Sequence, residues 1–476
     1  MTTTVIRNAD WIVAFEGGRH RYVKGDVAFE GSNLVHVGGA FAGPADREID
    51  GRGFMLMPGL VNIHSHPASE PLNKGWTDEI GSPRLYNSSL YEIMPLLRPD
   101  AEGVKASAAV AYCEALLSGV TTLVDLSVAW DGWVDLAAAS GIRGVLAPMY
   151  RSARWYTDNG HVVKYEWDEP AGRRAMETAL GVVAIAGRHA SGRLSGMVAP
   201  SQIDTCTPEL IRDSYAEAQR LRVPMQIHAA QSIVELHEIT RRHGKTPIEW
   251  LESLGVLGPS SIIGHGIFLD HHTSAHWPKR DDLKSILDSG TSIAHCPTVF
   301  IRRGITMQTV GGYIRRGVNI GIGTDTYPHN MLEELRNALY ASRIVAQDPF
   351  DLRTADIFNA ATLGGAKALG RTDIGRLEKG AKADLVMVDL DSPAMKPLRD
   401  PVRSLIYVAA ERAVRHVFVD GAQVVADGRV TTLDYGAAAA ELDAVQQRLL
   451  PQVRQLDWGK RSHLDISPLA FDRDWE

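Results

Sequence analysis

Cysteine is scarce in this sequence: its 476 residues include three, Cys113, Cys206 and Cys296. They lie far apart and form no CxxC pair, so the spacing excludes a disulfide framework. A chain without such a framework is typical of a reducing compartment, and we therefore expect a cytoplasmic protein.

Long hydrophobic runs and runs of one charge are also missing. The longest apolar stretches are strand-sized, well short of the roughly 20 residues that a membrane helix requires. The N-terminus, MTTTVIRNADWIV, has no basic segment followed by a long apolar one. The net charge of -7, without a Lys/Arg cluster, argues against nucleic acid or an anionic membrane as partner. With 45% hydrophobic and 22% charged residues, the composition is that of a globular protein. The length of 476 residues suits one large domain plus a smaller one.

What the sequence does contain is a repeated alternation of short β-branched runs and helical stretches. The runs are nearly all apolar and end in polar residues, as expected of parallel strands buried on both faces. Eight such units predict an α/β protein with a (β/α)8 TIM-type barrel, whose active site gathers at the carboxyl ends of the strands. An open doubly wound sheet is the alternative. The runs are 54–66, 119–127, 143–150, 194–201, 224–230, 261–266, 292–297 and 318–325, and the clearest helical patterns are 101–117, 208–220 and 247–254.

The two ends of the chain differ from its middle. Residues 1–52 and 374–435 contain short alternating segments separated by turns, which predicts one small β-sandwich domain built from both ends. Residues 53–373 would form the barrel. Residues 436–476 would form a C-terminal helix and tail, because an amphipathic pattern extends from 437 to 456.

The first predicted barrel strand ends in a pair of histidines, His64 and His66. Alternate residues of a strand face the same side, so both imidazoles point inward and can share one cation. Such an inward pair on an apolar strand is costly unless it is bonded to something. A single HxH pair is nevertheless as easily explained by chance as by metal binding.

Three further strands end in residues that can bind a metal: His228 on the fifth, His265 on the sixth and Asp325 on the eighth. Neutral imidazoles and a carboxylate form metal sites that leave one position open for water. A metal lowers the pKa of that water toward about 7. Asp325 can then take up and deliver the proton, while His265 holds the water and stabilises charge. We therefore expect a catalytic metal centre.

The order HxH, His, His, Asp along eight units resembles the amidohydrolase superfamily over nearly the whole chain. Residues 57–66 (MPGLVNIHSH) are similar to its first-strand motif, 295–298 (HCPT) to its seventh-strand motif, and 375–384 (GRLEKGAKAD) to the segment that re-enters its β domain. The spacing is similar to the branch of mononuclear deaminases and of triazine, urea and carbamate hydrolases.

This resemblance implies one divalent metal per subunit, with zinc favoured over Fe, Mn or Co, and a homo-oligomer. The implied ligands are His64, His66, His228 and Asp325, with His265 beside them or as a further ligand. The fourth strand ends MVAPS without the lysine of two-metal members, which also favours one metal.

One departure bears on the substrate. Deaminases of this branch usually place Glu three residues after the fifth-strand histidine to shuttle a proton, whereas this chain has Gln231. A glutamine forms hydrogen bonds but does not exchange a proton as a carboxylic acid does. Ser201 and the pair Val299-Phe300 also replace residues that are usual in the branch.

We therefore expect metal-bound hydroxide to cleave a C–N bond in a small non-peptide amide, urea, carbamate or amino-substituted N-heterocycle. The catalytic residues would be His265, Asp325 and Gln231. The alternative is hydrolytic dehalogenation, or another displacement on a heteroaromatic ring, as in chlorohydrolases. A non-catalytic assembly partner and a protein that only captures a ligand are further alternatives, which the five intact metal-binding positions disfavour.

Two long segments after predicted strands, 67–100 and 151–168, are rich in aromatic residues and are placed to cover the site. Aromatic side chains there would bind a flat or apolar substrate, or else pack on one another. The candidate substrate-binding residues are Trp76, Tyr86, Trp155, His161, Thr298 and His329. For His329, a place at the start of a helix capped by Asn330 is the alternative.

Overall fold

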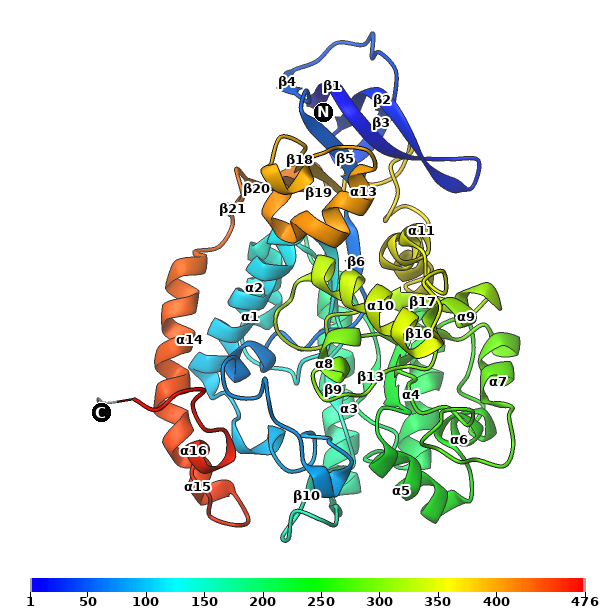
Figure 1. Cartoon of the computed structure of the whole chain (residues 1–476), viewed down its shortest axis with the longest axis vertical. Helices are drawn as coiled ribbons and strands as arrows, with labels where there is room; N and C mark the ends of the chain where they lie inside the picture. Colours follow the sequence, from blue (N-terminus) through cyan, green and yellow to red (C-terminus); the bar gives the residue numbers. More distant parts are fainter. Residues whose placement is uncertain (1, 474–476) are drawn as a thin grey trace.

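The computed structural model of the protein describes residues 2–473, and the last three residues of the predicted tail lie outside this range. A β-rich part stands at the top of a larger part in which helices surround strands (Figure 1). None of the helices within residues 2–473 is both long and apolar enough to span a membrane.

Strands from both ends of the chain form one nine-stranded sheet in the upper part of Figure 1. β5 joins the two segments, because it pairs in parallel with β1 and antiparallel with β18. Ile12, Leu56 and Leu385 from these strands are buried in one apolar cluster. The second layer of a sandwich stays a prediction. The strands are β1 (Thr3–Glu16), β2 (Arg19–Glu30), β3 (Asn33–Val37), β4 (Arg47–Asp50), β5 (Phe54–Pro58), β18 (Leu385–Asp389), β19 (Val414–Val419), β20 (Ala422–Ala426) and β21 (Arg429–Val430).

Eight strands from the middle of the chain form a parallel sheet in the order β12-β8-β7-β6-β17-β16-β15-β14. Hydrogen bonds also link its two outer strands, because Val198, just after β12, donates to Pro224 O (3.0 Å) and accepts from Gln226 N (2.9 Å) beside β14. The strands are β6 (Leu60–Asn62), β7 (Val120–Asp125), β8 (Arg143–Leu146), β12 (Ser195–Gly196), β14 (Met225–Ala229), β15 (Ser261–His265), β16 (Ser292–His295) and β17 (Asn319–Ile322). Two small pairs, β9 (Met149–Tyr150) with β13 (Ala199–Pro200) and β10 (Ala153–Tyr156) with β11 (Lys164–Trp167), complete the strands.

The run predicted as the first barrel strand, 54–66, is divided between the two sheets: β5 belongs to the mixed sheet and β6 to the parallel one. Gly59 separates them, and a Cβ there would approach Thr121 Oγ1 to 2.0 Å. Only glycine permits so close a passage. The chain therefore leads directly from the β-rich part to His64 and His66.

The helical patterns predicted between strands are confirmed to within one residue, as α1 (Ala101–Leu117), α4 (Pro208–Leu221) and α6 (Pro247–Ser253). Each begins after a side chain that accepts a backbone N–H, as expected of helix starts. The other α-helices within residues 2–473 are α2 (Trp133–Ser140), α3 (Glu169–Gly187), α5 (Ile233–His243), α7 (Asp282–Ser289), α8 (Pro297–Ile301), α9 (Val310–Arg315), α10 (Met331–Ala346), α11 (Thr354–Asn359), α12 (Gly365–Ala368), α13 (Pro401–Ser404), α14 (Tyr435–Leu449), α15 (Val453–Leu456) and α16 (His463–Ile466).

α14 is the C-terminal helix that the sequence predicts. It continues through a 3-10 turn (Leu450–Gln452) into α15, so the helical segment ends at Leu456, as predicted. It runs beside α1 (Figure 1), where Leu442 and Val445 are buried in one cluster with Val110. The C-terminal segment thereby covers the outside of the parallel-sheet part.

Candidate metal centre

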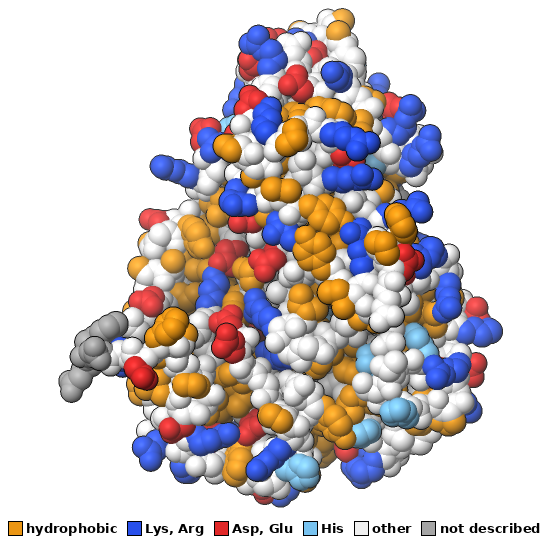
Figure 2. Space-filling model, viewed as in Figure 1, with side chains coloured by type: hydrophobic (Ala, Val, Ile, Leu, Met, Phe, Trp, Pro, Cys, Tyr) orange, Lys and Arg blue, Asp and Glu red, His pale blue; other side chains and the backbone are white. Residues whose placement is uncertain are grey.

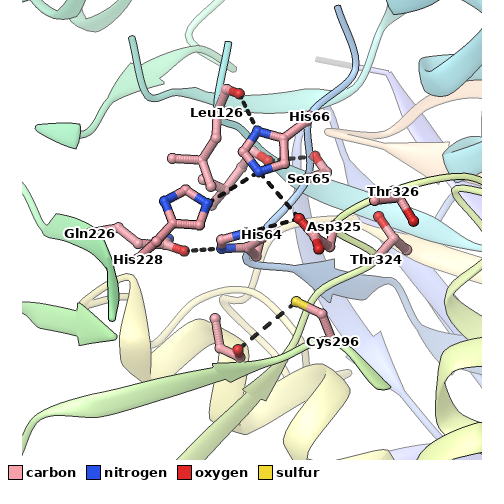
Figure 3. A network of polar contacts seen from close by, with 12 residues as sticks. His64, Ser65, His66, Leu126, Gln226, His228, Cys296, Thr324, Asp325 and Thr326 are labelled. Carbon is pink, nitrogen blue, oxygen red and sulfur yellow. Dashed lines mark hydrogen bonds and ion pairs between the residues drawn. The ribbon is translucent and has the colours of Figure 1, made fainter. Parts of the chain in front are cut away.

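The five predicted metal-binding side chains meet at the carboxyl ends of β6, β14, β15 and β17, and four of them are drawn in Figure 3. One ligand atom from each of His64, His228, His265 and Asp325 lies within 4.8 Å of the others, and all four residues are buried. His66 joins this group, since its Nε2 lies 3.2 Å from His228 Nε2 and 3.2 Å from Asp325 Oδ1.

Hydrogen bonds on the far side of three imidazoles fix their orientation. Nδ1 of His66 lies 2.6 Å from the backbone oxygen of Leu126, and Nδ1 of His228 lies 2.6 Å from that of Ser201. Nδ1 of His64 faces the side-chain oxygen of Gln226. Since Nδ1 must carry the proton in each bond, Nε2 is left as the free electron pair that a metal requires.

The donor set fits a divalent metal. Nε2 of His64 is buried without a hydrogen-bond partner, which is costly for a polar atom unless something else binds it. Asp325 Oδ1 lies 3.3 Å from that nitrogen. Imidazole nitrogens with one carboxylate form a typical zinc site.

The charges of the group also suit metal binding. Burial and the neighbouring imidazoles hold the pKa of His228 well below its usual value, and burial lowers the pKa of His265 to about 3. Burial opposes ionisation of Asp325, but His265, His64 and His66 outweigh it and hold the pKa of Asp325 well below 3.8. Burial likewise opposes protonation of His66, whose pKa the Asp325 carboxylate nevertheless raises. Neutral His228 and His265 beside the ionised Asp325 are in the forms that bind a metal, whereas at His66 a metal would compete with a proton.

The backbone at three strand ends adopts a conformation that is rare for residues with a side chain. Ala230, His265 and Asp325 have φ of 55°, 80° and 57°. Each such residue costs on the order of 1–3 kcal/mol, and residues of this kind cluster at functional sites. Local hydrogen bonds hold two of them, because Asp325 N donates to His64 O (2.9 Å) and Ala230 N donates to the Glu235 carboxylate (2.5 Å).

A cavity of about 240 Å³ opens on this group and includes His66, His228, His265 and Asp325 in its lining. Gln231 also lines it, and its amide nitrogen is buried without a partner. Glu70 lies in the same wall, four residues after His66, with one carboxyl oxygen buried and unpartnered. Burial raises the pKa of Glu70 to about 7, and the Asp325 charge adds to this rise.

The six candidate substrate-binding residues are not among the side chains that line this cavity. Trp76 is buried in a cluster with residues of α1 and α14, and Trp155 packs on Tyr91 with its ring nitrogen bonded to Asp204. Tyr86 and His161 line a separate surface groove.

The remaining two candidates are held by contacts within the fold. Thr298 accepts a hydrogen bond from Asn337, and its N–H donates to Glu334. His329 is fully buried, with its backbone N–H directed at Glu114. Substrate contact stays a prediction for all six. Contacts within the fold explain the positions of the four buried ones, whereas Tyr86 and His161 are exposed.

Three cavity or support residues were missed by the sequence reasoning. The position of Gln226 could have been predicted from the sequence. It lies two residues before His228 on one strand, so both side chains face the same side. Glu70 and Arg303 lie outside the barrel strands, Glu70 at the start of a short 3-10 helix (Glu70–Asn73) and Arg303 just after α8, and their sequence neighbourhoods gave no sign that they reach the cavity.

Comparison with known proteins places the chain in a family. The sequence model described as Amidohydrolase family matches residues 55–424. The chain belongs to the amidohydrolase family. This confirms the resemblance seen in the sequence and makes the chain a hydrolase of carbon–nitrogen bonds other than peptide bonds.

Two relatives illustrate the similarity. A 5-methylthioadenosine/S-adenosylhomocysteine deaminase of Natronomonas pharaonis is 32% identical over 87% of this chain and 91% of its own. A 5'-deoxyadenosine deaminase of Methanothermobacter thermautotrophicus is 29% identical over 88% of this chain and 95% of its own.

Solved structures with a similar fold have bound zinc. An adenosine deaminase from Xanthomonas campestris with bound zinc has a TM-score of 0.80 at 24% identity, over 94% of this chain and 98% of its own. An atrazine chlorohydrolase from Arthrobacter aurescens with zinc has a TM-score of 0.79 at 24% identity, over 93% of this chain and 100% of its own. At this identity the likeness shows the fold alone.

Proposed function

We propose that this protein is a zinc-dependent deaminase, which hydrolyses the exocyclic C–N bond of a small amino-substituted N-heterocycle and releases ammonia. The observation that carries the proposal is the buried group of His64, His228, His265 and Asp325, with His64 Nε2 unpartnered and His66 beside it, at a cavity of about 240 Å³. The deaminase names of the relatives support the reaction class.

We further propose that the parallel sheet is a (β/α)8 barrel. In support, each strand of the sheet pairs with the next along the chain from β6 to β12 and from β14 to β17, and β17 pairs with β6. The hydrogen bonds of Val198 connect β12 to β14, so the strands form a closed ring. In a barrel, residues at the carboxyl ends of the strands meet at one face, as these ligands do. The cytoplasmic location and the homo-oligomer stay predictions from the sequence.

A divalent metal bound here would lower the pKa of a coordinated water and polarise the bond to be cleaved. Asp325 is the ionised carboxylate nearest the metal ligands and is placed to accept the proton of the attacking water. His265 Nδ1 is buried without a partner and is available to stabilise developing charge. Gln231 offers its unpartnered amide nitrogen to a ring nitrogen or oxygen of the substrate.

The volume of the cavity favours a small substrate. Ligand sites typically have roughly 300–1,000 Å³, and this cavity, at about 240 Å³, lies below that range. A single substituted heterocycle is therefore a better match than a nucleoside, whose added sugar needs more room.

Hydrolytic dehalogenation of a heteroaromatic ring is the second candidate, and Gln231 is the observation that favours it. Chloride leaves without a proton, whereas an amine must be protonated as it leaves. Glu70 is the carboxyl group, besides Asp325, that the cavity offers for such a transfer. The leaving group that is released therefore decides between the two reactions.

The test is a panel of matched amino- and chloro-substituted pyrimidines and triazines, with ammonia and chloride measured for the zinc-loaded protein. We expect ammonia release, and one zinc per chain by metal analysis. His64→Ala should lose zinc and turnover together, while the exposed His237→Ala should keep both. Turnover without any divalent ion would refute the metal centre, and chloride release without ammonia would establish the second candidate.

A further inference from the structure

The lining of the metal cavity carries two guanidinium groups, those of Arg98 and Arg303. Its acidic side chains are Glu70 and Asp325. Even with both carboxyl groups ionised, two guanidiniums and a divalent metal leave the cavity with an excess of positive charge. A substrate of opposite charge would compensate that excess.

Among residues 2–473, Arg303 has no acidic side chain within ion-pair distance. It follows α8, and one of its terminal nitrogens donates to the backbone oxygen of Val299. Its Nε is buried without any hydrogen bond, and within residues 2–473 it forms no ion pair with a carboxylate. Burial lowers the pKa of Arg303, and the Glu70 charge opposes this from a distance without a direct contact.

The neighbouring arginine shows the contrast. Arg302 donates to the backbone oxygen of Tyr327 at 2.7 Å and lies 3.9 Å from the Asp78 carboxylate. The charge of Arg302 is therefore compensated by groups of the fold itself. A guanidinium is costly to bury without an acceptor, so the free Nε of Arg303 beside a cavity indicates a partner that arrives with the ligand.

Arg98 lies at the end of the long segment 67–100 and lines the same cavity. Burial lowers its pKa, and nearby Arg154 adds to the effect. No ion pair involving Arg98 occurs in the described part of the chain. Arg98 is exposed, so water solvates its charge, and it adds only long-range attraction for an anion.

We propose that the substrate carries a carboxylate, which Arg303 binds while the metal group acts on the C–N bond, so that the substrate class is a small amino-substituted heterocyclic acid. Arg98 adds long-range attraction for the same charge. The reaction in this proposal is taken from the proposed function. The carboxylate of the substrate is inferred separately, from the charges that line the cavity. Carboxylates match the planar fork of a guanidinium and form charge-assisted hydrogen bonds with it.

The test compares an aminopyrimidine carboxylate with its carboxamide, which has nearly the same shape but no charge. Binding is measured by calorimetry and turnover by ammonia release, with wild type, Arg303→Met, Arg303→Lys and the adjacent control Arg302→Met. We expect wild type and the control to bind the acid at least about tenfold more tightly than the amide, in line with a charge-assisted contact. Arg303→Met should abolish the preference and Arg303→Lys should keep part of it.

Calorimetry on metal-free wild-type protein separates the two possible carboxylate partners. If the metal bound the carboxylate, the preference would vanish in the metal-free protein and persist in Arg303→Met, which would overturn the proposal. Equal binding of acid and amide by wild type would also overturn it. The difference in binding between acid and amide can be measured without turnover. If the proposed reaction failed, ammonia release would be absent while the difference in binding would still be measurable.

Discussion

The side chain of Gln226 is hydrogen-bonded to two consecutive residues that follow β6. Its oxygen faces Nδ1 of His64 (Figure 3). Its nitrogen donates to Ile63 O at 2.9 Å. All three groups are buried. Gln226 and His228 lie on the same face of β14, so one strand supplies a metal ligand and also the group that orients another ligand. Partners of this kind set the tautomer and the direction of the imidazole.

Replacing Gln226 by Leu should therefore weaken metal binding. The substitution removes both hydrogen bonds, and loss of such a partner typically costs about 10- to 100-fold in metal affinity. Zinc affinity measured by competition with a chelator checks this expectation. Gln219→Leu, on the surface of α4, is the matched control and should bind zinc as wild type does. Equal affinity in both variants would mean that Gln226 does not orient His64.

Gln231→Glu should raise ammonia release from amino-heterocycles. The new carboxyl group would stand at the wall of the cavity and could pass a proton to the leaving amine, an effect that is worth about tenfold or more for positioned acids. Initial rates on a panel of aminopyrimidines measure the change, with zinc content as a check of the site. Gln231→Leu removes the hydrogen bonds without adding an acid and should show no gain. A fall in rate on every compound in Gln231→Glu would show that the native amide, and not a missing acid, serves the substrate.

The parts of the site that lie on strands could be predicted, and the physical reason is the period of the strand. His64 and His66 are two residues apart, and His228, His265 and Asp325 each end an apolar run, so their directions follow from the backbone alone. The division of 54–66 at Gly59 was not visible, because both halves are apolar and buried and only the contact with Thr121 reveals the junction.

The parts that lie on loops could not be predicted, because tertiary contacts set their course. Glu70 reaches the cavity through a turn in which its N–H donates to His66 O, and Arg303 reaches it after the short helix α8. In the sequence, an aromatic residue that packs in the core looks the same as one that binds a ligand. Trp76 and Trp155 are both buried in the fold, so aromatic content alone did not identify the residues that line the cavity.

The β-rich part and the parallel sheet are joined by a buried ion pair that should contribute strongly to stability. Arg143 of β8 donates from Nε and Nη2 to Asp384 at 2.8 and 2.9 Å, and from Nη2 to Asp420 at 2.8 Å. Arg143→Met should lower the free energy of unfolding by about 3–5 kcal/mol, because it removes the guanidinium that neutralises the buried Asp384 carboxylate. Denaturant unfolding measures the loss.

Arg154→Met is the control for this prediction. Its pair with Glu166 is more than half exposed, with side chains 56% and 60% accessible. Exposed pairs contribute at most about 1 kcal/mol, so the control should change stability little. Similar losses in both variants would show that the Arg143 contacts do not hold the two parts together.

Asp282 should make the stability of the folded chain depend on pH. Its carboxyl group, at the start of α7, accepts hydrogen bonds from Thr246 Oγ1 (2.6 Å) and Asp270 N (2.8 Å). Burial raises the pKa of Asp282 from 3.8 to about 7. Between these values the unfolded chain has lost the proton and the folded chain keeps it, so the free energy of unfolding falls as the pH rises from about 4 to about 7. The loss from this group is at most about 4 kcal/mol.

Asp282→Asn should remove this dependence, because the amide does not titrate. Any cost of the substitution itself is the same at every pH, so the difference between wild type and variant isolates the carboxyl group. Guanidinium unfolding at several pH values from 4.5 to 8 measures it, with Asp288→Asn on the exposed side of the same helix as control. The control should follow the wild-type curve. If Asp282→Asn follows it too, the buried carboxyl group does not retain its proton and the stability of the fold in this range depends on other groups.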